Sequence, residues 1–371
     1  MASHSRRRST LVIQRGASRN EGKREQRTEA RVRKRRRLAT SPAEADYFDG
    51  LPDDLLVSVL SKLSSSAQRP SDLISALLTS KRFHALGHHP LVLSMAGSSC
   101  LSVRAKAWRD SAHRFLKRCV DCGNLEASYI LGMVCGISLR FVLGDERFLR
   151  LGDKIRFYAL ENRGSGASLM AKAAVGSHAA ALYSLAIVQF NGSGGSKAHK
   201  DLRAGVSLCA RAAFLGHVDA LRELGHCLQD GYGIRRNTAA GRRLLVQANA
   251  RELAAAVSSS WPEWLEKRRL ADPGGYSLLS DYGCSLPAPE PHPANRFLVE
   301  WFGSRGAPAS EELRLCSHRG CGRRETRRHE FRRCSVCSLA NYCSRACQAL
   351  DWKLSHKAEC APTVPWAAAS L

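Results

Sequence analysis

Eight cysteine and histidine side chains gather near the C-terminal end of the sequence, mostly in close pairs. They are Cys316, Cys321, Cys334, Cys337, Cys343, Cys347, His356 and Cys360. Thiolates and imidazoles suit Zn²⁺, and a closed structural site takes four such ligands. The surrounding segment has few large apolar residues, so metal must supply much of its folding free energy. The sequence therefore predicts two structural zinc ions in a binding module, with no open position for catalysis.

The residues around these ligands make the array resemble the MYND-type zinc finger. The segment YCSRACQALDWKLSHKAEC at 342–360 carries the resemblance, and the whole module is expected at 311–361. The family implies two interleaved sites, each of which closes a long loop and so restricts the unfolded chain. The first zinc would be held by Cys316, Cys321, Cys343 and Cys347. The second would be held by Cys334, Cys337, His356 and Cys360.

The resemblance also implies binding of a Pro-rich peptide through Gln348 and Trp352. These two residues are four apart and would share one face of a helix. The alternative for Trp352 is a core position that fixes this helix to the second site. A RING finger also interleaves two ions, but its histidine comes earlier in the ligand order than His356 does. We therefore do not expect the module to recruit a ubiquitin-conjugating enzyme directly.

Residues 47–96 predict a pair of amphipathic helices well before the zinc module. Pro52 suits a helix N-terminus, and Asp53 and Asp54 suit the positive end of the helix dipole. One apolar face follows, and a second helix begins after a polar loop at 64–71. The segments LPDDLLVSVLSKL, DLISALLTSKRFHAL and HPLVL make this stretch resemble the F-box, with Phe83 in place of the usual tryptophan.

The F-box resemblance implies docking to the Skp-type linker and the cullin of a ubiquitin ligase. The residues expected to dock are Leu51, Pro52, Leu55, Leu56, Val59, Leu60, Leu77 and Phe83. The alternative is that these helices simply begin the helical domain that follows them.

Residues 97–256 contain an internal repeat of helical segments. GSHAAALYSLAIVQFNGSG at 176–194 aligns with GHVDALRELGHCLQDGYG at 216–233, and a weaker copy begins at 123. This pattern resembles the tetratricopeptide-like repeats of the Sel type, with Gly176 and Gly216 as equivalent positions. Such repeats stack into solenoids that bind partners. An ordinary helical bundle is the alternative.

The stretch 257–310 is rich in proline and predicts a linker. Within it NRFLVEWF, at 295–302, is an apolar island that would form a short strand or helix against the repeats. The tail 1–46 is expected to be disordered, and residues 362–371 would form a short C-terminal tail.

The net charge of +24 is concentrated at the ends of the chain, since residues 1–38 hold 14 Lys or Arg against 3 Glu. The basic cluster Arg33, Lys34, Arg35, Arg36 and Arg37 predicts nuclear import, with the cytoplasm as a further location. A transit peptide is the alternative. The arginines of the zinc module predict a solvated loop, so nucleic acid is not the expected partner.

Further patterns narrow the class of protein. No apolar run is long enough to cross a membrane. Seven cysteines outside the zinc module are scattered, which indicates a reducing compartment. Cys119 and Cys122 lack a second pair, so we interpret them as ordinary thiols. The sequence carries no phosphate-binding loop or nucleophile motif that would indicate an enzyme.

Together these patterns predict a mainly α protein: F-box helices, a helical repeat solenoid and a small zinc-stabilised module. This combination is similar to a plant F-box family. It implies a non-catalytic, substrate-recruiting adaptor of a Skp–cullin–F-box ubiquitin ligase whose protein substrate is unknown. A nuclear scaffold or transcriptional co-regulator acting through the finger is one alternative. A methyltransferase is another, because MYND modules occur beside such domains, but no cofactor-binding motif supports it.

Overall fold

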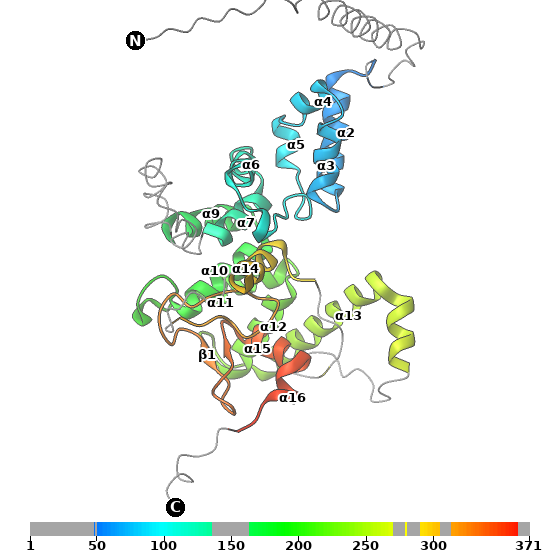
Figure 1. Ribbon diagram of the computed structural model, residues 1–371. Helices are drawn as coiled ribbons and strands as arrows, with labels where there is room; N and C mark the ends of the chain where they lie inside the picture. Colours follow the sequence, from blue (N-terminus) through cyan, green and yellow to red (C-terminus); the bar gives the residue numbers. More distant parts are fainter. Residues whose placement is uncertain are drawn as a thin grey trace, which may run out of the picture. The chain divides into compact units, whose positions relative to one another are not determined.

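The computed structural model describes residues 48, 50–135, 163–269, 279, 290–304 and 313–362 (Figure 1). The basic tail, the C-terminal tail and the predicted import cluster lie outside the described residues. The chain divides into two compact units, Met1–Leu55 and Leu56–Leu371. In the first, the Leu51 amide donates to the Phe48 carbonyl at 3.2 Å, just before the first residues of helix α2.

The regular secondary structure of the described residues is almost entirely helical, which confirms the mainly α fold class. Its one strand pair, β1 and β2, is antiparallel, with Arg332 opposite Tyr342. The strands span Arg332–Arg333 and Asn341–Tyr342. No described helix has the length and apolar character needed to span a bilayer.

Four short helices form the F-box region: α2 (Asp53–Ser66), α3 (Pro70–Leu77), α4 (Lys81–Leu86) and α5 (Pro90–Ser94). Asp72 accepts hydrogen bonds from the Gln68 and Arg69 amides and so caps α3, which Pro70 begins. The loop predicted at 64–71 is shorter in the structure because α2 continues to Ser66. Ser64 is buried there and donates to the Val92 carbonyl at 2.9 Å, which ties α2 to α5.

The repeat region consists of helices that pack in consecutive pairs: α7 with α9, α10 with α11, and α12 with α13. Glycines allow close approach within the pairs. A Cβ on Gly225 would lie 2.9 Å from Leu245, and one on Gly132 would lie 2.8 Å from Met170. The helices of this region are α6 (Asp110–Asp121), α7 (Leu125–Cys135), α9 (Arg163–Val175), α10 (Ala179–Asn191), α11 (Leu202–Phe214), α12 (Val218–Asp230) and α13 (Thr238–Arg269).

The equivalent positions of the repeats differ by one residue from the sequence alignment. Gly123 and Gly216 have φ angles of 86° and 94°, and the residue that adopts this left-handed turn in the middle repeat is Ser177, at 65°. The next residue caps the following helix in each repeat, through Asn124, His178 and His217. Gly176 is therefore not the counterpart of Gly216. The turn conformation sets the alignment, and a non-glycine residue adopts it in this repeat.

The predicted linker 257–310 is helical over much of its described length. Helix α13 continues to Arg269, and α14 spans Pro293–Ser304. The apolar island therefore forms a helix, and its buried residues are Phe297, Leu298, Trp301 and Phe302. Helix α14 packs on α7 and on the short 3₁₀ helix η1 (Ala105–Ala107). The aromatic ring of Phe297 lies 5.1 Å from that of Trp108. Proline is compatible with this helix because Pro293 stands at its first position.

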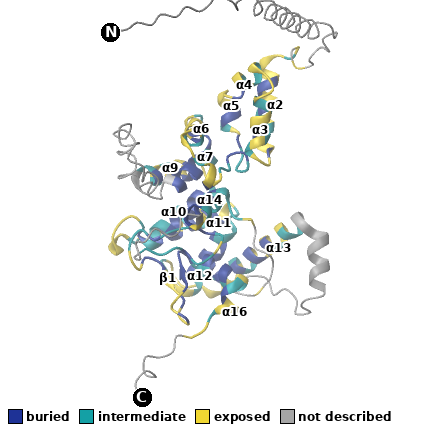
Figure 2. Cartoon of the chain, viewed as in Figure 1, coloured by how far each residue is buried: buried dark blue, intermediate teal, exposed yellow. Residues whose placement is uncertain are grey.

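Buried side chains run continuously from the F-box helices through the repeats into the C-terminal module (Figure 2). Seven of the eight predicted zinc ligands are buried, and Cys360 is partly buried. The module that carries them therefore packs against the repeats.

Candidate metal centre and its contacts with the repeats

Short elements position the eight predicted ligands. After the strands come α15 (Arg345–Asp351), the single π-helical turn η5 (Trp352–His356) and α16 (Lys357–Glu359). The Ser344 hydroxyl caps α15 by accepting from the Cys347 amide at 3.0 Å. The Tyr342 hydroxyl donates to Asp351 at 2.8 Å, which fixes the strand to the helix.

The structure groups the eight side chains into the two sets that the family resemblance implied. Within each set all ligand atoms lie within 4.8 Å of one another. In the first set the Cys343 sulfur lies 3.6 Å from the sulfurs of both Cys321 and Cys347. In the second, Cys334 and Cys360 sulfurs are 3.8 Å apart, and Cys337 Sγ is 3.5 Å from His356 Nε2.

These spacings fit tetrahedral zinc and exclude disulfides. A tetrahedron with Zn–S bonds of about 2.3 Å has sulfurs roughly 3.8 Å apart, whereas disulfide sulfurs are about 2.05 Å apart. Four protein ligands fill each set, so each site would be closed and structural. In the second set, Cys334 and Cys337 are the third and fourth ligands along the sequence, and His356 and Cys360 are the last two. The two clusters could therefore hold metal and would join distant parts of the module.

Arg323 lies between the first cluster and the repeat helices. Its guanidinium lies 3.9 Å from the sulfurs of Cys321 and Cys343 and donates to Ser184 of α10 at 2.8 Å. It also lies over the ring of Tyr183, 5.8 Å from the centroid. Hydrogen bonds from the neighbouring thiols hold the pKa of Cys321 well below its ordinary value, and Arg323 lowers that pKa further.

Helix α12 contacts the N-terminus of α15 through a buried carboxylate. Glu223 accepts from the Ala346 amide at 2.9 Å, where the helix dipole favours a negative charge. Burial raises the pKa of Glu223, while the bond from Ala346 and the nearby Arg332 lower it. Arg345 adds a second contact, since it donates to the His226 carbonyl at 3.0 Å.

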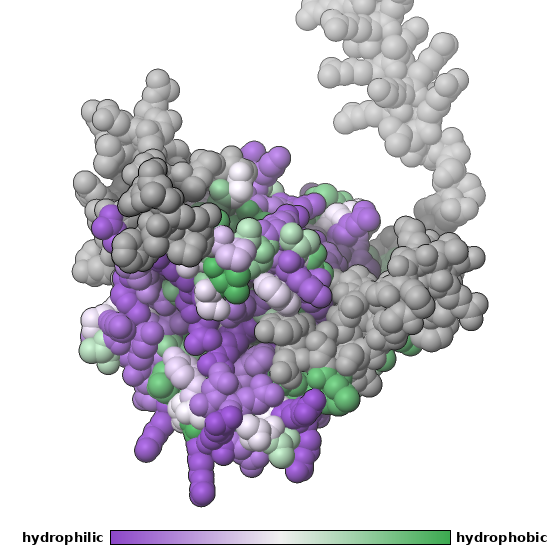
Figure 3. All heavy atoms as spheres, turned by 90° about the horizontal axis from the view of Figure 1, so that it is seen from below, coloured by the Kyte–Doolittle hydropathy of each residue, from purple (hydrophilic) through white to green (hydrophobic). Residues whose placement is uncertain are grey.

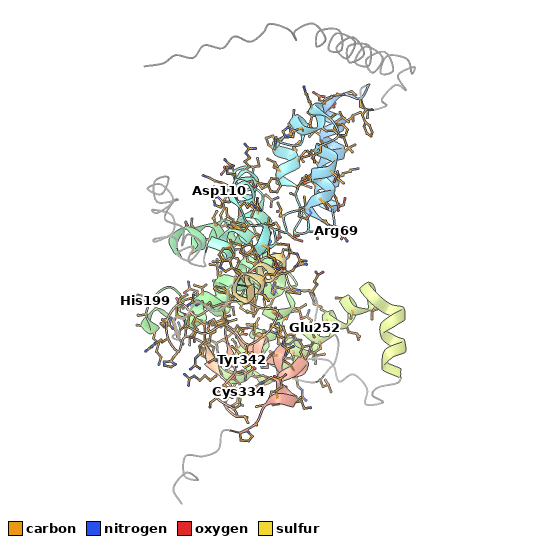
Figure 4. All side chains as sticks on the ribbon, in the orientation of Figure 1. Arg69, Asp110, His199, Glu252, Cys334 and Tyr342 are labelled. Carbon is orange, nitrogen blue, oxygen red and sulfur yellow. The ribbon has the colours of Figure 1, made fainter. Side chains whose placement is uncertain are left out.

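A second buried network joins α12, α13 and the π-helical turn. Arg222 is fully buried and donates to Glu252 and Asn249, each at 3.0 Å. Lys353 donates to the same Glu252 at 3.1 Å. Figure 4 labels Glu252 together with Cys334 and Tyr342 of the module. Because a buried charge is costly without a partner, the single carboxylate of Glu252 stabilises both cations.

Two equivalent helices of the repeats present equivalent residues to the module. Tyr183 and Ser184 of α10 contact Ser344 and Arg323, and the corresponding pair on α12 is Arg222 and Glu223. Sequence reasoning missed these contacts. The available signal was the charged pair Arg222–Glu223 between two leucines of the helix, because buried charges require partners.

The loop of arginines predicted to be solvated is partly buried against the repeats. Arg327 donates to the Gly192 carbonyl at 2.8 Å and also to the Asn191 carbonyl, at the end of α10. Glu330 accepts from Ser193 and from the Thr326 amide. The C-terminal turn of α10 offers carbonyls without helical partners, and these accept hydrogen bonds from the arginine. The prediction is wrong for Arg323 and Arg327. Of the other four, Arg328, Arg332 and Arg333 are exposed and Arg324 is partly buried.

The structure places both predicted peptide-binding residues at partly exposed positions. Gln348 lies on α15, and Trp352 begins the π-helical turn. The Trp352 ring makes an edge contact with the ring of His356, at 5.8 Å between centroids. Trp352 therefore also touches a predicted ligand of the second site, so both interpretations of this residue remain predictions.

The predicted Skp-docking residues divide between surface and core. Leu55 and Val59 are about half exposed and Pro52 is exposed, whereas Leu56 and Leu60 are buried at 1% and 2% exposure. The prediction is wrong for Leu56 and Leu60, because they face the interior of the helical bundle. Leu51, Leu77 and Phe83 are partly exposed.

Two regions of the chain match known family models. Residues 48–93 match the F-box-like family model, and residues 316–360 match the MYND finger model. Two proteins of Arabidopsis thaliana, F-box protein At1g67340 and F-box protein At5g50450, are each 57% identical to the chain. The matches cover 90% and 88% of this chain and 88% of each relative. A solved Sel1 repeat protein from Oxalobacter formigenes matches 42% of the chain and 95% of its own length, with 22% identity and a TM-score of 0.29.

The fold and the two cysteine clusters define a helical-repeat protein with an F-box and a MYND finger. The chain belongs to the plant F-box protein family of the two Arabidopsis relatives. This confirms the family that the sequence resembles, and it supports an adaptor role.

Proposed function

We propose that the chain is a substrate-recruiting adaptor of a Skp–cullin–F-box ubiquitin ligase. The observation that carries the proposal is the apolar surface of its F-box helices. Val59 of α2 and Leu78 after α3 are 52% and 75% exposed, and Ile74, Leu91 and Met95 are also exposed. Large apolar side chains gathered on one small domain indicate a protein interface. The family match to the F-box supports a Skp-type linker as the partner.

The test is co-purification of Skp and cullin with the full chain. We expect Val59→Asp or Leu78→Asp to abolish association, because each places a charge in an apolar interface while the core residues Leu56 and Leu60 stay intact. Val175→Asp is the matched control, because Val175 is 80% exposed but belongs to the repeats. Cullin retained by both F-box variants would contradict the proposal.

We further propose that the C-terminal module holds two structural zinc ions, one in each cluster. The sulfur spacings and the closed sets of four ligands support this number. When bound, the ions would cross-link the module and supply no chemistry to a substrate. The recruited protein would then be held by the repeats, the finger or both, near the ligase's catalytic partner.

The basic cluster at 33–37 supports a nuclear location. We expect a fluorescent fusion of the full chain to accumulate in the nucleus and a variant with these five residues changed to alanine to spread into the cytoplasm. A variant that remains nuclear would contradict this assignment without affecting the adaptor proposal.

A further inference from the structure

A groove in the repeats, separate from the metal clusters, has the features of a binding site. Its volume is about 650 Å³, and it lies between the first part of α11 and the turn that follows α12. Leu202, Val206 and Ile234 supply apolar surface, and Arg203 and Arg235 supply positive charge.

Glycines shape the wall of this groove. Gly231 and Gly233 have φ angles of 73° and 72°, a conformation that favours glycine. A Cβ on Gly233 would lie 2.6 Å from the Leu202 carbonyl oxygen. The turn therefore packs directly against the start of α11, and the groove between them is a built feature of the repeat.

The two arginines of the groove have no carboxylate paired with them in the described part of the chain. Arg203 and Arg235 are exposed and make no ion pair with any residue in the described ranges. Nearby acids are already engaged: Asp201 caps α11 by accepting from the Ala204 amide, and Asp230 pairs with Arg345.

Several cations lie close to Lys200, just before the start of α11. Burial lowers the pKa of Lys200, and repulsion from Arg327, Lys197 and Arg332 lowers it further. Tyr232 stands between Gly231 and Gly233 in the sequence. The guanidinium of Arg332 lies over its ring, 5.9 Å from the centroid. Figure 3 shows one face of the molecule, which is mainly hydrophilic with small apolar islands. The groove thus combines local apolar contacts with a positive field that attracts anionic partners.

We propose that this groove binds an acidic peptide segment of the recruited protein. Carboxylates of the peptide would pair with Arg203 and Arg235, and apolar side chains between them would pack on Leu202, Val206 and Ile234. The proposal rests on the adaptor function proposed above. A nucleic acid fits less well, because the lining has no aromatic side chain on which a base could stack.

The test measures fluorescence anisotropy of a labelled peptide that alternates glutamate and leucine, with the full zinc-loaded chain. We expect binding that weakens as salt rises, and no binding of the same peptide with glutamine in place of glutamate. The double variant Arg203→Glu with Arg235→Glu should weaken binding at least about tenfold, since like charges then meet across the groove. The matched control is Arg242→Glu with Arg243→Glu. It has the same charge change on exposed α13 residues outside the groove, and should bind within about twofold of the unmodified chain.

Equal losses in both double variants would overturn the proposal, because attraction would then depend on net charge alone. A single-stranded oligothymidine that binds tightly while the acidic peptide does not would also overturn it. Skp co-purification separates this proposal from the adaptor function. A chain that binds the glutamate peptide at Arg203 and Arg235 but fails to retain Skp keeps the groove assignment and loses the adaptor function.

Discussion

Histidine side chains cap several helices of this protein. In each case the Nδ1 atom accepts from a backbone amide in the first turn, at His89, His178, His217 and His292. Serine, threonine, aspartate and asparagine are the usual caps, so the sequence did not indicate this role. An Nδ1 acceptor must be unprotonated. Where burial shifts the pKa of such a histidine, as at His217, the cap links helix stability to pH.

His217 offers the clearest case at the start of α12. Burial lowers the pKa of His217; Asp219 opposes this shift, and the nearby Arg323 adds to it. A lowered pKa means that the unfolded chain binds the proton more readily than the folded chain. The contribution of His217 to stability is thus present above its ordinary pKa of about 6.5 and is lost as pH falls toward the folded value.

We predict that His217→Ala lowers the free energy of unfolding by about 1 kcal/mol at pH 7.5, the usual value of a lost cap. The deficit should shrink by pH 5.5, because protonation already removes this cap from the unmodified protein. Urea unfolding at the two pH values measures the difference. His217→Asn is the control, since asparagine restores a cap that does not titrate. A deficit of His217→Ala that is the same at both pH values would rule out this linkage.

At the scale of elements, the sequence predicted most of what local patterns determine. The amphipathic segments of α2 and α3 and the helices of the repeats follow from apolar spacing, and the pairing of the zinc ligands followed from the family resemblance. For the segment that forms α14, the sequence predicted either a strand or a helix, because a short apolar run does not distinguish the two. Its surroundings decide the outcome: His292, which caps it, also pairs with Glu126 of α7 at 2.8 Å.

The contacts between elements could not be predicted in the same way. Arg323, Arg327 and Arg328 stand close together in the sequence, yet the first two bind the repeats and the third is exposed. Composition shows that a loop is basic, but burial depends on which carbonyls and hydroxyls face it. Those groups belong to α10, far away along the chain. Ser177 makes the same point for the repeats, because the turn that defines their register is visible only in its φ angle.

At the scale of the whole molecule, the finger and the repeats share buried charges. Glu223 and Glu252 belong to the repeat helices but rely on the module, through the Ala346 amide and Lys353. Arg323 couples the first cysteine cluster to Ser184 in the same way. If metal folds the module, it also completes the partners of these repeat residues. Zinc loss should therefore destabilise the repeats as well as the finger.

We predict that exhaustive chelation of the full chain removes about two zinc ions and lowers the melting temperature of the helical circular dichroism signal by about 6–12 °C. This range corresponds to roughly 3 kcal/mol, as expected when buried carboxylates lose hydrogen-bond partners. Hydrogen exchange locates the effect. Amides of α10, α12 and α13 should lose protection, whereas those of α3 and α4, which have no contact with the finger among the described hydrogen bonds, should keep theirs and serve as the internal control. Unchanged protection of α12 after complete zinc removal would show that the repeats hold Glu223 and Glu252 without the finger.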